Sequence, residues 1–141
     1  DTLMKDRKRQ QGQSLVEFAL LFPILILIVL GIADLGRAYY ALVTLNDAAE
    51  EGAMYAAISP DPTNSAEREK IRDRAAHATS GLINADDLKQ NWDQDSVVVG
   101  GDTVTVTVEY DFQVLTPIMQ SFFGGGTVTL RGRAVNAVIV P

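Results

Sequence analysis

A single acidic residue, Glu17, stands at the start of a long apolar run, five residues after Gly12. A carboxylate at the edge of a hydrocarbon environment is costly, and such a residue usually has a partner and a function. One interpretation is a carboxylate that faces lipid headgroups, with basic side chains nearby. The other requires cleavage of the Gly12–Gln13 peptide bond, because the new α-amine of Gln13 would then be available to pair with Glu17 of a neighbouring subunit.

Groups suited to catalysis or metal binding are scarce. The chain has no cysteine, which excludes disulfides and thiolate chemistry, and its one histidine, His77, is expected to be exposed on a charged helix. Asn91, Asp93 and Asp95 place oxygen atoms at alternate positions. However, Ser96 stands where an EF-hand loop requires glycine. We therefore expect no enzymatic activity, no cofactor and no metal site.

The apolar run is long enough to approach the thickness of a membrane. Residues 18–33 contain no charged side chain, and as a helix they would extend about 24 Å. Adding Leu15, Val16 and Leu35 brings the run close to the roughly 30 Å of a hydrocarbon core. A signal peptide also has a basic start and an apolar run. This run, however, lacks a small-x-small cleavage motif and continues at helical spacing, which predicts the first half of one long helix.

The charges are unevenly distributed along the 141 residues, whose net charge is −6. Residues 1–12 carry four cations and two anions, whereas residues 13–141 carry eight cations and sixteen anions. A basic segment before an apolar run stays in the cytoplasm under the positive-inside rule. We therefore expect residues 1–12 inside the cytoplasm and everything after residue 35 outside it. The acidic remainder offers no basic surface for nucleic acid.

Apolar side chains recur at spacings of three and four beyond the run, which predicts a helix over about residues 14–58. The stripe consists of Leu35, Tyr39, Leu42, Leu45, Ala49, Ala53 and Ala56. We expect Tyr39 to pack in a globular core and Tyr40 to lie near the membrane interface. Polar residues fall mostly on other faces, namely Asp34, Arg37, Thr44, Asp47 and Glu51. Pro60 and Pro62 then end the helix.

The remaining residues predict one short helix followed by strands. A capping box at residues 64–67 opens a helix over about 65–79, with Gly81 as its stop and a loop or short turn over 82–95. Strict Thr/Val alternation over residues 103–110 predicts a half-buried strand, joined to residues 96–99 by a tight Gly-Gly-Asp hairpin. A short turn at 118–123 precedes a last strand over 127–140.

Residues 12–25, Gly-Gln-Ser-Leu-Val-Glu-Phe-Ala-Leu-Leu-Phe-Pro-Ile-Leu, resemble the TadE/TadG-like pseudopilin family of the tight-adherence (type IVb) pilus system. The resemblance covers roughly residues 10–58. It implies a prepilin peptidase cut after Gly12, so that Gln13 is the mature N-terminus and Glu17 the intersubunit partner. The side chains expected to pack in the filament core are Phe18, Leu21, Phe22, Pro23, Leu25, Ile28, Val29 and Ile32. Pro23 is expected either to kink the helix or to unwind it locally.

The predicted fold class is α+β and pilin-like, with one long N-terminal helix whose first half is hydrophobic. Its second half packs on a small antiparallel β-sheet, and one short helix accompanies it. The expected divisions are a basic leader at 1–12, the long helix at 13–58, and a globular α+β domain at 59–141. Within the long helix, residues 13–35 form the membrane or filament-core segment.

The predicted function is a structural subunit, a pilin or pseudopilin, that passes from the inner membrane into an extracellular pilus. Its partners would be copies of itself or other pilins, a prepilin peptidase, the pilus assembly machinery and, before assembly, the membrane. No nucleic acid partner is expected. The alternative is a single-pass, membrane-anchored extracytoplasmic binding or accessory module that never polymerises.

Overall fold

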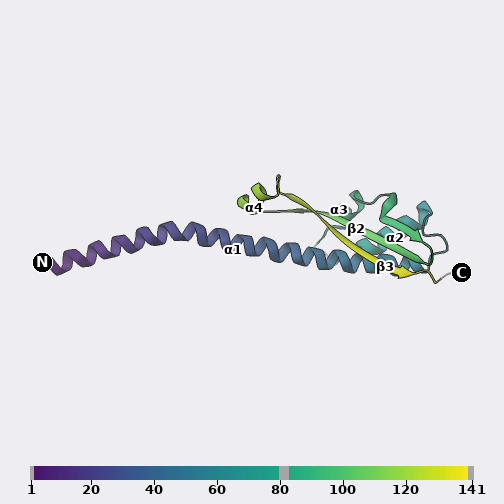
Figure 1. The fold of residues 1–141 in the computed structure, drawn as a ribbon, viewed down its shortest axis with the longest axis horizontal. Coiled ribbons are helices and arrows are strands. Elements are labelled where there is room, and N and C mark those ends of the chain that lie inside the picture. Colours follow the sequence, from purple (N-terminus) through teal and green to yellow (C-terminus); the bar gives the residue numbers. More distant parts are fainter. Residues whose placement is uncertain (1, 80–82, 140–141) are drawn as a thin grey trace.

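One long helix carries the rest of the molecule on its C-terminal half (Figure 1). The computed structural model describes residues 2–79 and 83–139. The helical elements before the sheet are α1 (Thr2–Ala57), α2 (Ser65–His77), α3 (Ala85–Gln90) and the 3-10 turn η1 (Gln94–Ser96). The elements that follow are β1 (Val97–Gly100), β2 (Thr103–Gln113), α4 (Pro117–Phe122) and β3 (Thr127–Ala137). The predicted α+β class, with a long N-terminal helix and a small antiparallel sheet, is confirmed.

The sheet has the order β1-β2-β3, and both strand pairs are antiparallel. The hairpin between β1 and β2 turns at Gly101, whose φ of 63° is accessible to glycine at little cost. Alternation in β2 buries one side of the strand, as the Thr/Val pattern predicts, through Val104, Val106 and Val108. This valine side packs against the second half of α1, which also contacts α2.

Small residues allow the sheet to approach the backbone of α1. The buried residues on this part of the helix are Ala41, Thr44, Leu45, Ala48, Ala49, Ala53, Ala56 and Ala57. A Cβ atom added to Gly132 of β3 would lie 2.3 Å from the carbonyl oxygen of Leu45, so only glycine fits there. A Cβ atom on Gly52 would lie 3.2 Å from Val106 Cγ1. At Gly132 the strand backbone therefore lies against the helix backbone, and at Gly52 the helix backbone lies against a side chain of the sheet.

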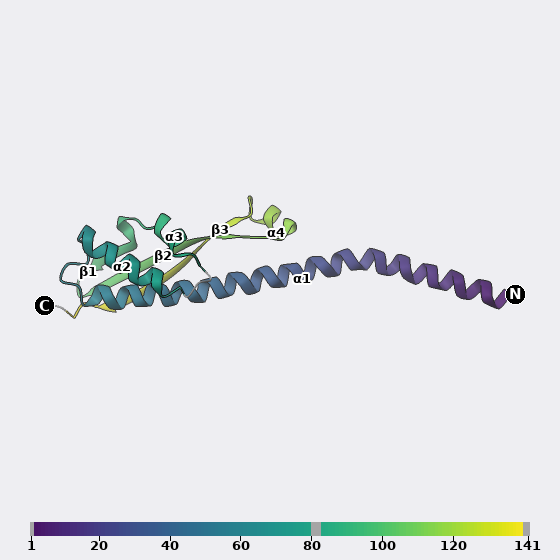
Figure 2. The same cartoon turned by 180° about the vertical axis from the view of Figure 1, so that it is seen from behind.

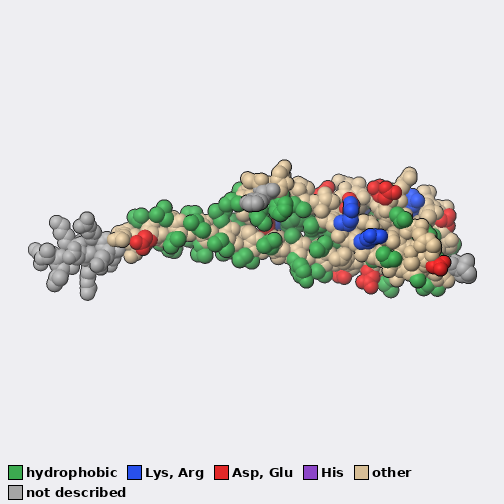
Figure 3. Space-filling view, in the orientation of Figure 1, with side chains coloured by type: hydrophobic (Ala, Val, Ile, Leu, Met, Phe, Trp, Pro, Cys, Tyr) green, Lys and Arg blue, Asp and Glu red, His purple; other side chains and the backbone are tan. Residues whose placement is uncertain are grey.

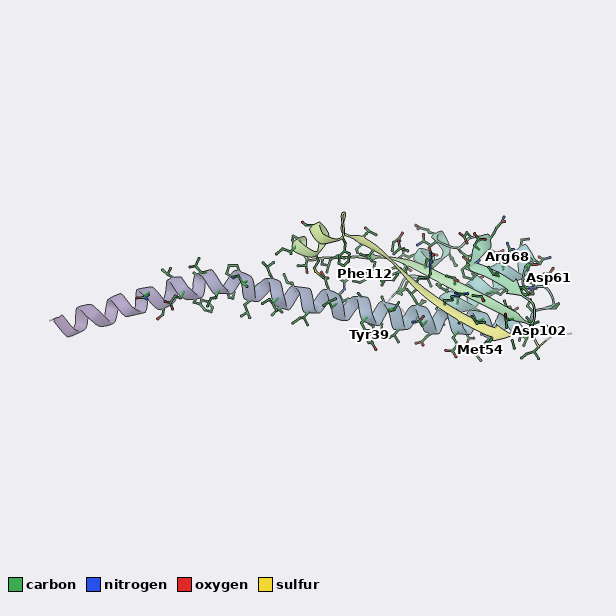
Figure 4. The ribbon with its side chains drawn as sticks, viewed as in Figure 1. Tyr39, Met54, Asp61, Arg68, Asp102 and Phe112 are labelled. Atoms are coloured by element: carbon green, nitrogen blue, oxygen red, sulfur yellow. The ribbon has the colours of Figure 1, made fainter. Side chains whose placement is uncertain are left out.

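The buried face of α1 differs from the predicted stripe in its first half. Tyr39 is 71% exposed, so the prediction that it packs in the globular core is wrong, and Leu35, on the same predicted stripe, is 60% exposed. Tyr39 points away from the sheet (Figure 4). The buried or half-buried positions are instead Asp34, Ala38, Ala41, Leu45 and Ala48, at alternating spacings of four and three. Most residues of this series are small, which lets the sheet approach the helix closely, and the large side chains of Leu35 and Tyr39 lie off this face.

The boundaries of α1 follow from its local sequence. The helix begins at Thr2 rather than near residue 14, because residues 2–11 are mostly helix-forming and contain no proline. Gly12 alone costs only about 1 kcal/mol in a helix, which is too little to end one of this length. The helix ends at Ala57, one residue before the expected position, and the segment containing Pro60 follows it.

Most later elements agree with the predictions, but residues 85–90 form the helix α3 where a loop or short turn was expected. Asn64 caps α2 by accepting a hydrogen bond from Ala66 N at 2.9 Å. Glu67 does not close a capping box, because its carboxylate accepts hydrogen bonds from Ser59 Oγ and Lys70 Nζ instead. Strand β3 ends at Ala137, earlier than the expected residue 140. The predicted stop at Gly81 lies outside the described residues.

Candidate functional site

The first half of α1 presents a continuous apolar surface that nothing in the structure covers. Apart from the half-buried Leu27, its large apolar side chains from Leu15 to Ile32 are between 41% and 72% exposed. An 18-residue window of this helix has a mean hydropathy of 2.8, and none of that window is buried. The space-filling view shows hydrophobic side chains along the visible face of this part of the helix (Figure 3). By length and composition, α1 can therefore cross a membrane.

All the predicted filament-core side chains lie on this uncovered surface. They are Phe18, Leu21, Phe22, Pro23, Leu25, Ile28, Val29 and Ile32, and each is classed as exposed. The rings of Phe18 and Phe22 contact each other, with centroids 5.3 Å apart. Apart from Pro23, these residues recur at spacings of three and four along one face of the helix. Leu20, Ile26 and Leu30 are also exposed and lie on its other faces, so this part of the helix suits an environment that is apolar on every side, such as lipid or a bundle of helices.

The predicted processing residues lie at the N-terminal end of that surface. Gly12, Gln13 and Glu17 are exposed, and α1 passes through them without a break. Gln13 Nε2 donates a hydrogen bond to Glu17 Oε1 at 3.3 Å, so the two side chains share one helix face. A Cβ atom added to Gly12 would meet nothing within 4 Å.

Pro23 lies inside a continuous helix. Proline lacks an amide donor, so the carbonyl of residue 19 loses its usual partner and the helix bends. Figure 1 shows α1 changing direction within its bare first half. This geometry corresponds to the kink interpretation, because no residue around Pro23 leaves the helical conformation.

Asp34, which the sequence analysis assigned to an outer face, is 4% exposed. Its Oδ2 accepts hydrogen bonds from Thr116 Oγ1 at 2.6 Å, Thr116 N at 2.7 Å and Leu115 N at 3.1 Å. Arg37 Nη1 lies 3.3 Å from Asp34 Oδ1, and the Arg37 guanidinium lies 5.2 Å from the centre of the Phe112 ring. Asp34 thus ties the distal end of the sheet to α1 at the end of the apolar run.

The contact between Asp34 and Thr116 could not be found from sequence spacing, because 82 positions separate the two residues. One signal was available for Asp34 itself. It belongs to the series Asp34, Ala38, Ala41, Leu45 and Ala48, which has the alternating spacing of a buried helix face. The competing stripe through Leu35 and Tyr39 has larger apolar side chains. It was therefore predicted as the buried face in place of this series.

The acidic residues near Trp92 have a structural role. Asp93 caps η1, because its Oδ1 accepts hydrogen bonds from Asp95 N at 2.9 Å and Ser96 Oγ at 3.1 Å. In the described part of the chain, no group of three or more His, Cys, Asp or Glu side chains could hold a metal ion. His77 is exposed, as predicted.

A protein-family model described as TadE-like protein matches residues 12–54. Over these residues, the chain is similar to that family. The predicted TadE/TadG-like resemblance is confirmed there, over a match that begins at Gly12 and includes both halves of α1. The match includes the uncovered apolar segment of α1. No curated protein and no solved structure matches the chain.

Proposed function

We propose that this protein is a structural subunit, a pilin or pseudopilin, of a Tad-type pilus filament. The observation that carries the proposal is the uncovered first half of α1, which projects beyond the globular domain as a helix with apolar side chains all round it. Such a surface needs lipid before assembly and other helices afterwards. The TadE-like match covers this same segment.

Before assembly, residues 13–35 span the inner membrane with the basic residues 1–12 in the cytoplasm. The charge asymmetry supports this orientation through the positive-inside rule. The domain at 59–141 then lies outside the cytoplasm, and α1 connects the two compartments. In this arrangement the membrane anchor and the scaffold of the sheet are one continuous helix.

Cleavage of the Gly12–Gln13 bond by a prepilin peptidase would place an α-amine one helical turn from Glu17. In the isolated chain, the Glu17 carboxylate accepts an exposed hydrogen bond from the Gln13 side chain. In a filament, the carboxylate pairs instead with the α-amine of a neighbouring subunit. An ion pair in an apolar environment is tolerated because each charge compensates the other, whereas either charge alone is strongly unfavourable.

Transfer from lipid to the filament core exchanges one apolar environment for another. Hydrophobic burial therefore contributes little to the difference in free energy between the two states, as in other helix associations within lipid. Assembly machinery must supply the work of extraction. Packing of the exposed side chains of residues 18–32 and the Glu17 ion pair then stabilise the assembled state.

Shearing cells that produce the protein separates this function from a membrane-anchored module that never polymerises. We expect the wild-type protein in the sheared fraction, sedimenting as a polymer in the absence of detergent. The Glu17→Gln variant should insert in the membrane and be reduced in that fraction. Asp47→Asn, a change to an exposed acid on the same helix, is the matched control. Wild-type protein found solely in detergent-extractable membranes would contradict the proposal.

A further inference from the structure

The distal end of the sheet carries no charge over an unusual length of sequence. Residues 112–130, which include α4 and the ends of β2 and β3, contain no Asp, Glu, Lys, Arg or His. We call the part between the strands, residues 114–126, the tip. Three of its large apolar side chains are exposed to solvent: Leu115 is 65% exposed, Ile118 49% and Phe123 54%. An uncharged, exposed apolar surface of this kind indicates a site of contact with another protein or with a membrane.

The tip has a defined structure. Val114 N donates to Gly126 O at 2.8 Å, and Gln120 Nε2 donates to Val114 O at 2.8 Å. Gly124, Gly125 and Gly126 all have positive φ angles, which let the chain reverse direction after α4. The exposed apolar side chains are therefore held by an ordered turn, in which several backbone groups are hydrogen-bonded within the tip.

Asp34 determines where along the axis of α1 the tip is attached. Its carboxylate binds the backbone of Leu115 and Thr116, and Asp34 is the first charged residue after the apolar run of residues 18–33. Both ribbon views place α4 beside α1 at the end of the sheet nearest the bare half of the helix (Figures 1 and 2). The tip therefore lies at the level where the anchoring segment ends.

The surroundings of the tip are also those of a membrane interface. Tyr39 and Tyr40, one to two turns beyond Asp34, are exposed, and tyrosines are enriched at the headgroup level. An apolar cavity of about 170 Å³ lies between α1 and the tip, lined by residues that include Leu35, Met119 and Phe123. The apolar surface is thus continuous from the bare helix to the tip.

We propose that the tip inserts into the outer interface of the bilayer while the protein is anchored, as a second membrane contact beside the spanning helix. The proposal rests on the membrane anchoring of residues 13–35. An apolar element lying in the interface is typically buried about 5–10 Å into the headgroup and acyl boundary. Asp34 is the positioning residue, because it holds Leu115 and Thr116 at that depth without itself contacting lipid.

The absence of cysteine from the chain makes a direct depth measurement practicable. Nitroxide labels would be attached to Ile118→Cys, Val98→Cys and Ile28→Cys variants of the full chain in phosphatidylcholine vesicles. Ile118 and Val98 are both 49% exposed, but Val98 lies on β1, away from the tip. Collision with oxygen, which concentrates in lipid, is compared with collision with a water-soluble nickel chelate.

We expect the Ile118 label to be more accessible to oxygen than to nickel, at a depth between those of the Val98 and Ile28 labels. An Ile118 label as aqueous as the Val98 label, with Ile28 in the bilayer, would overturn the tip proposal and leave the anchor intact. Shielding of Ile118 from both reagents would indicate a protein partner and would also overturn it. An aqueous Ile28 label would refute the anchor itself.

The role of Asp34 is tested in the same vesicles. Adding Asp34→Ala to the Ile118 label should shift the label toward the aqueous value, because the tip loses its attachment to α1. Adding Asp47→Ala, which removes an exposed carboxylate from the same helix, should leave the depth unchanged. An unchanged depth in the Asp34→Ala variant would contradict its positioning role.

Discussion

The two halves of α1 are both rich in apolar residues, but the first half is exposed and the second half is packed against the sheet. From Leu15 to Ile32 the side chains are mostly large and surround the helix, and nearly all of them are exposed. From Ala41 to Ala57 the buried side chains are mostly alanines along one face, against a sheet that reaches the helix backbone. The comparison shows that side-chain size, beyond hydrophobicity, determines whether this helix packs within its own chain or remains available to lipid and to other subunits.

The largest effect is expected where the second half contacts the sheet most closely. Gly132→Ala would force a Cβ atom to within 2.3 Å of the Leu45 carbonyl oxygen, so the strand or the helix must move. Overpacking of this kind costs about 3 kcal/mol or more when backbone has to shift. The free energy of unfolding, measured by denaturant titration in detergent micelles, should fall accordingly.

Gly100→Ala provides the control for that substitution. A Cβ atom at Gly100 would meet nothing within 4 Å, and this glycine is not among those with a positive φ angle. Its stability should be close to that of the wild type. Equal stability of the two variants would show that the sheet does not lie against the α1 backbone as described.

A charge in the middle of the bare half should have the next largest effect. Leu25→Arg places a cation near the centre of the apolar run, where insertion scales assign a cost of about 2.5–3.5 kcal/mol. We expect a larger fraction of the variant to be extracted from membranes by alkaline carbonate. Leu42→Arg makes the same change on an exposed position of the second half and should remain membrane-bound. Equal extraction of both variants would remove the distinction between the halves.

The junction between the halves is tested by Asp34→Ala. The change leaves three donors, Thr116 Oγ1, Thr116 N and Leu115 N, without their acceptor. An unsatisfied buried donor costs about 1–3 kcal/mol, so the tip should detach locally. Hydrogen exchange of the Leu115 and Thr116 amides should accelerate, while exchange of the β1–β2 hairpin remains unchanged. Unaltered protection of both amides would mean that Asp34 does not hold the tip.

The smallest effect concerns the surface at the far end of α1. Hydrogen bonds from Lys70 and then from Ser59 lower the pKa of Glu67. Because the folded-state pKa is lowered, ionised Glu67 stabilises the fold above its unfolded-state pKa, and this contribution is lost as the pH falls through the folded-state pKa. Ser59→Ala should raise the Glu67 pKa in an NMR titration, and Ser121→Ala on α4 should leave it unchanged. A Glu67 pKa that does not respond to Ser59→Ala would contradict the assigned cause.

Much of the fold could be predicted because its signals are local. The apolar run, the cap at Asn64 and the Thr/Val alternation of β2 each depend on neighbouring residues, and each appears in the structure. The buried face of α1 could not be predicted in the same way. It depends on how closely β3 approaches at Gly132, and that approach is a tertiary contact between residues far apart in sequence.

The candidate site likewise has one part that local sequence predicts and one part that depends on tertiary contacts. The exposed residues from Gly12 to Ile32 were recognisable because a motif and an uncharged run coincide there. The attachment of the tip to Asp34 was not, because a lone aspartate at a helix surface usually faces solvent. Its burial becomes intelligible only when the amides of Leu115 and Thr116 are known to lie beside it.

The most direct test of the central claim, that the bare half of α1 passes from the membrane into a filament as a processed helix, is the N-terminal mass of protein sheared from the cell surface. The account predicts a terminus at Gln13. A terminus upstream of Gln13 on sheared polymer would keep the filament but remove the α-amine pairing with Glu17. Absence of the protein from the sheared fraction, with the chain retained in membranes, would contradict the claim itself.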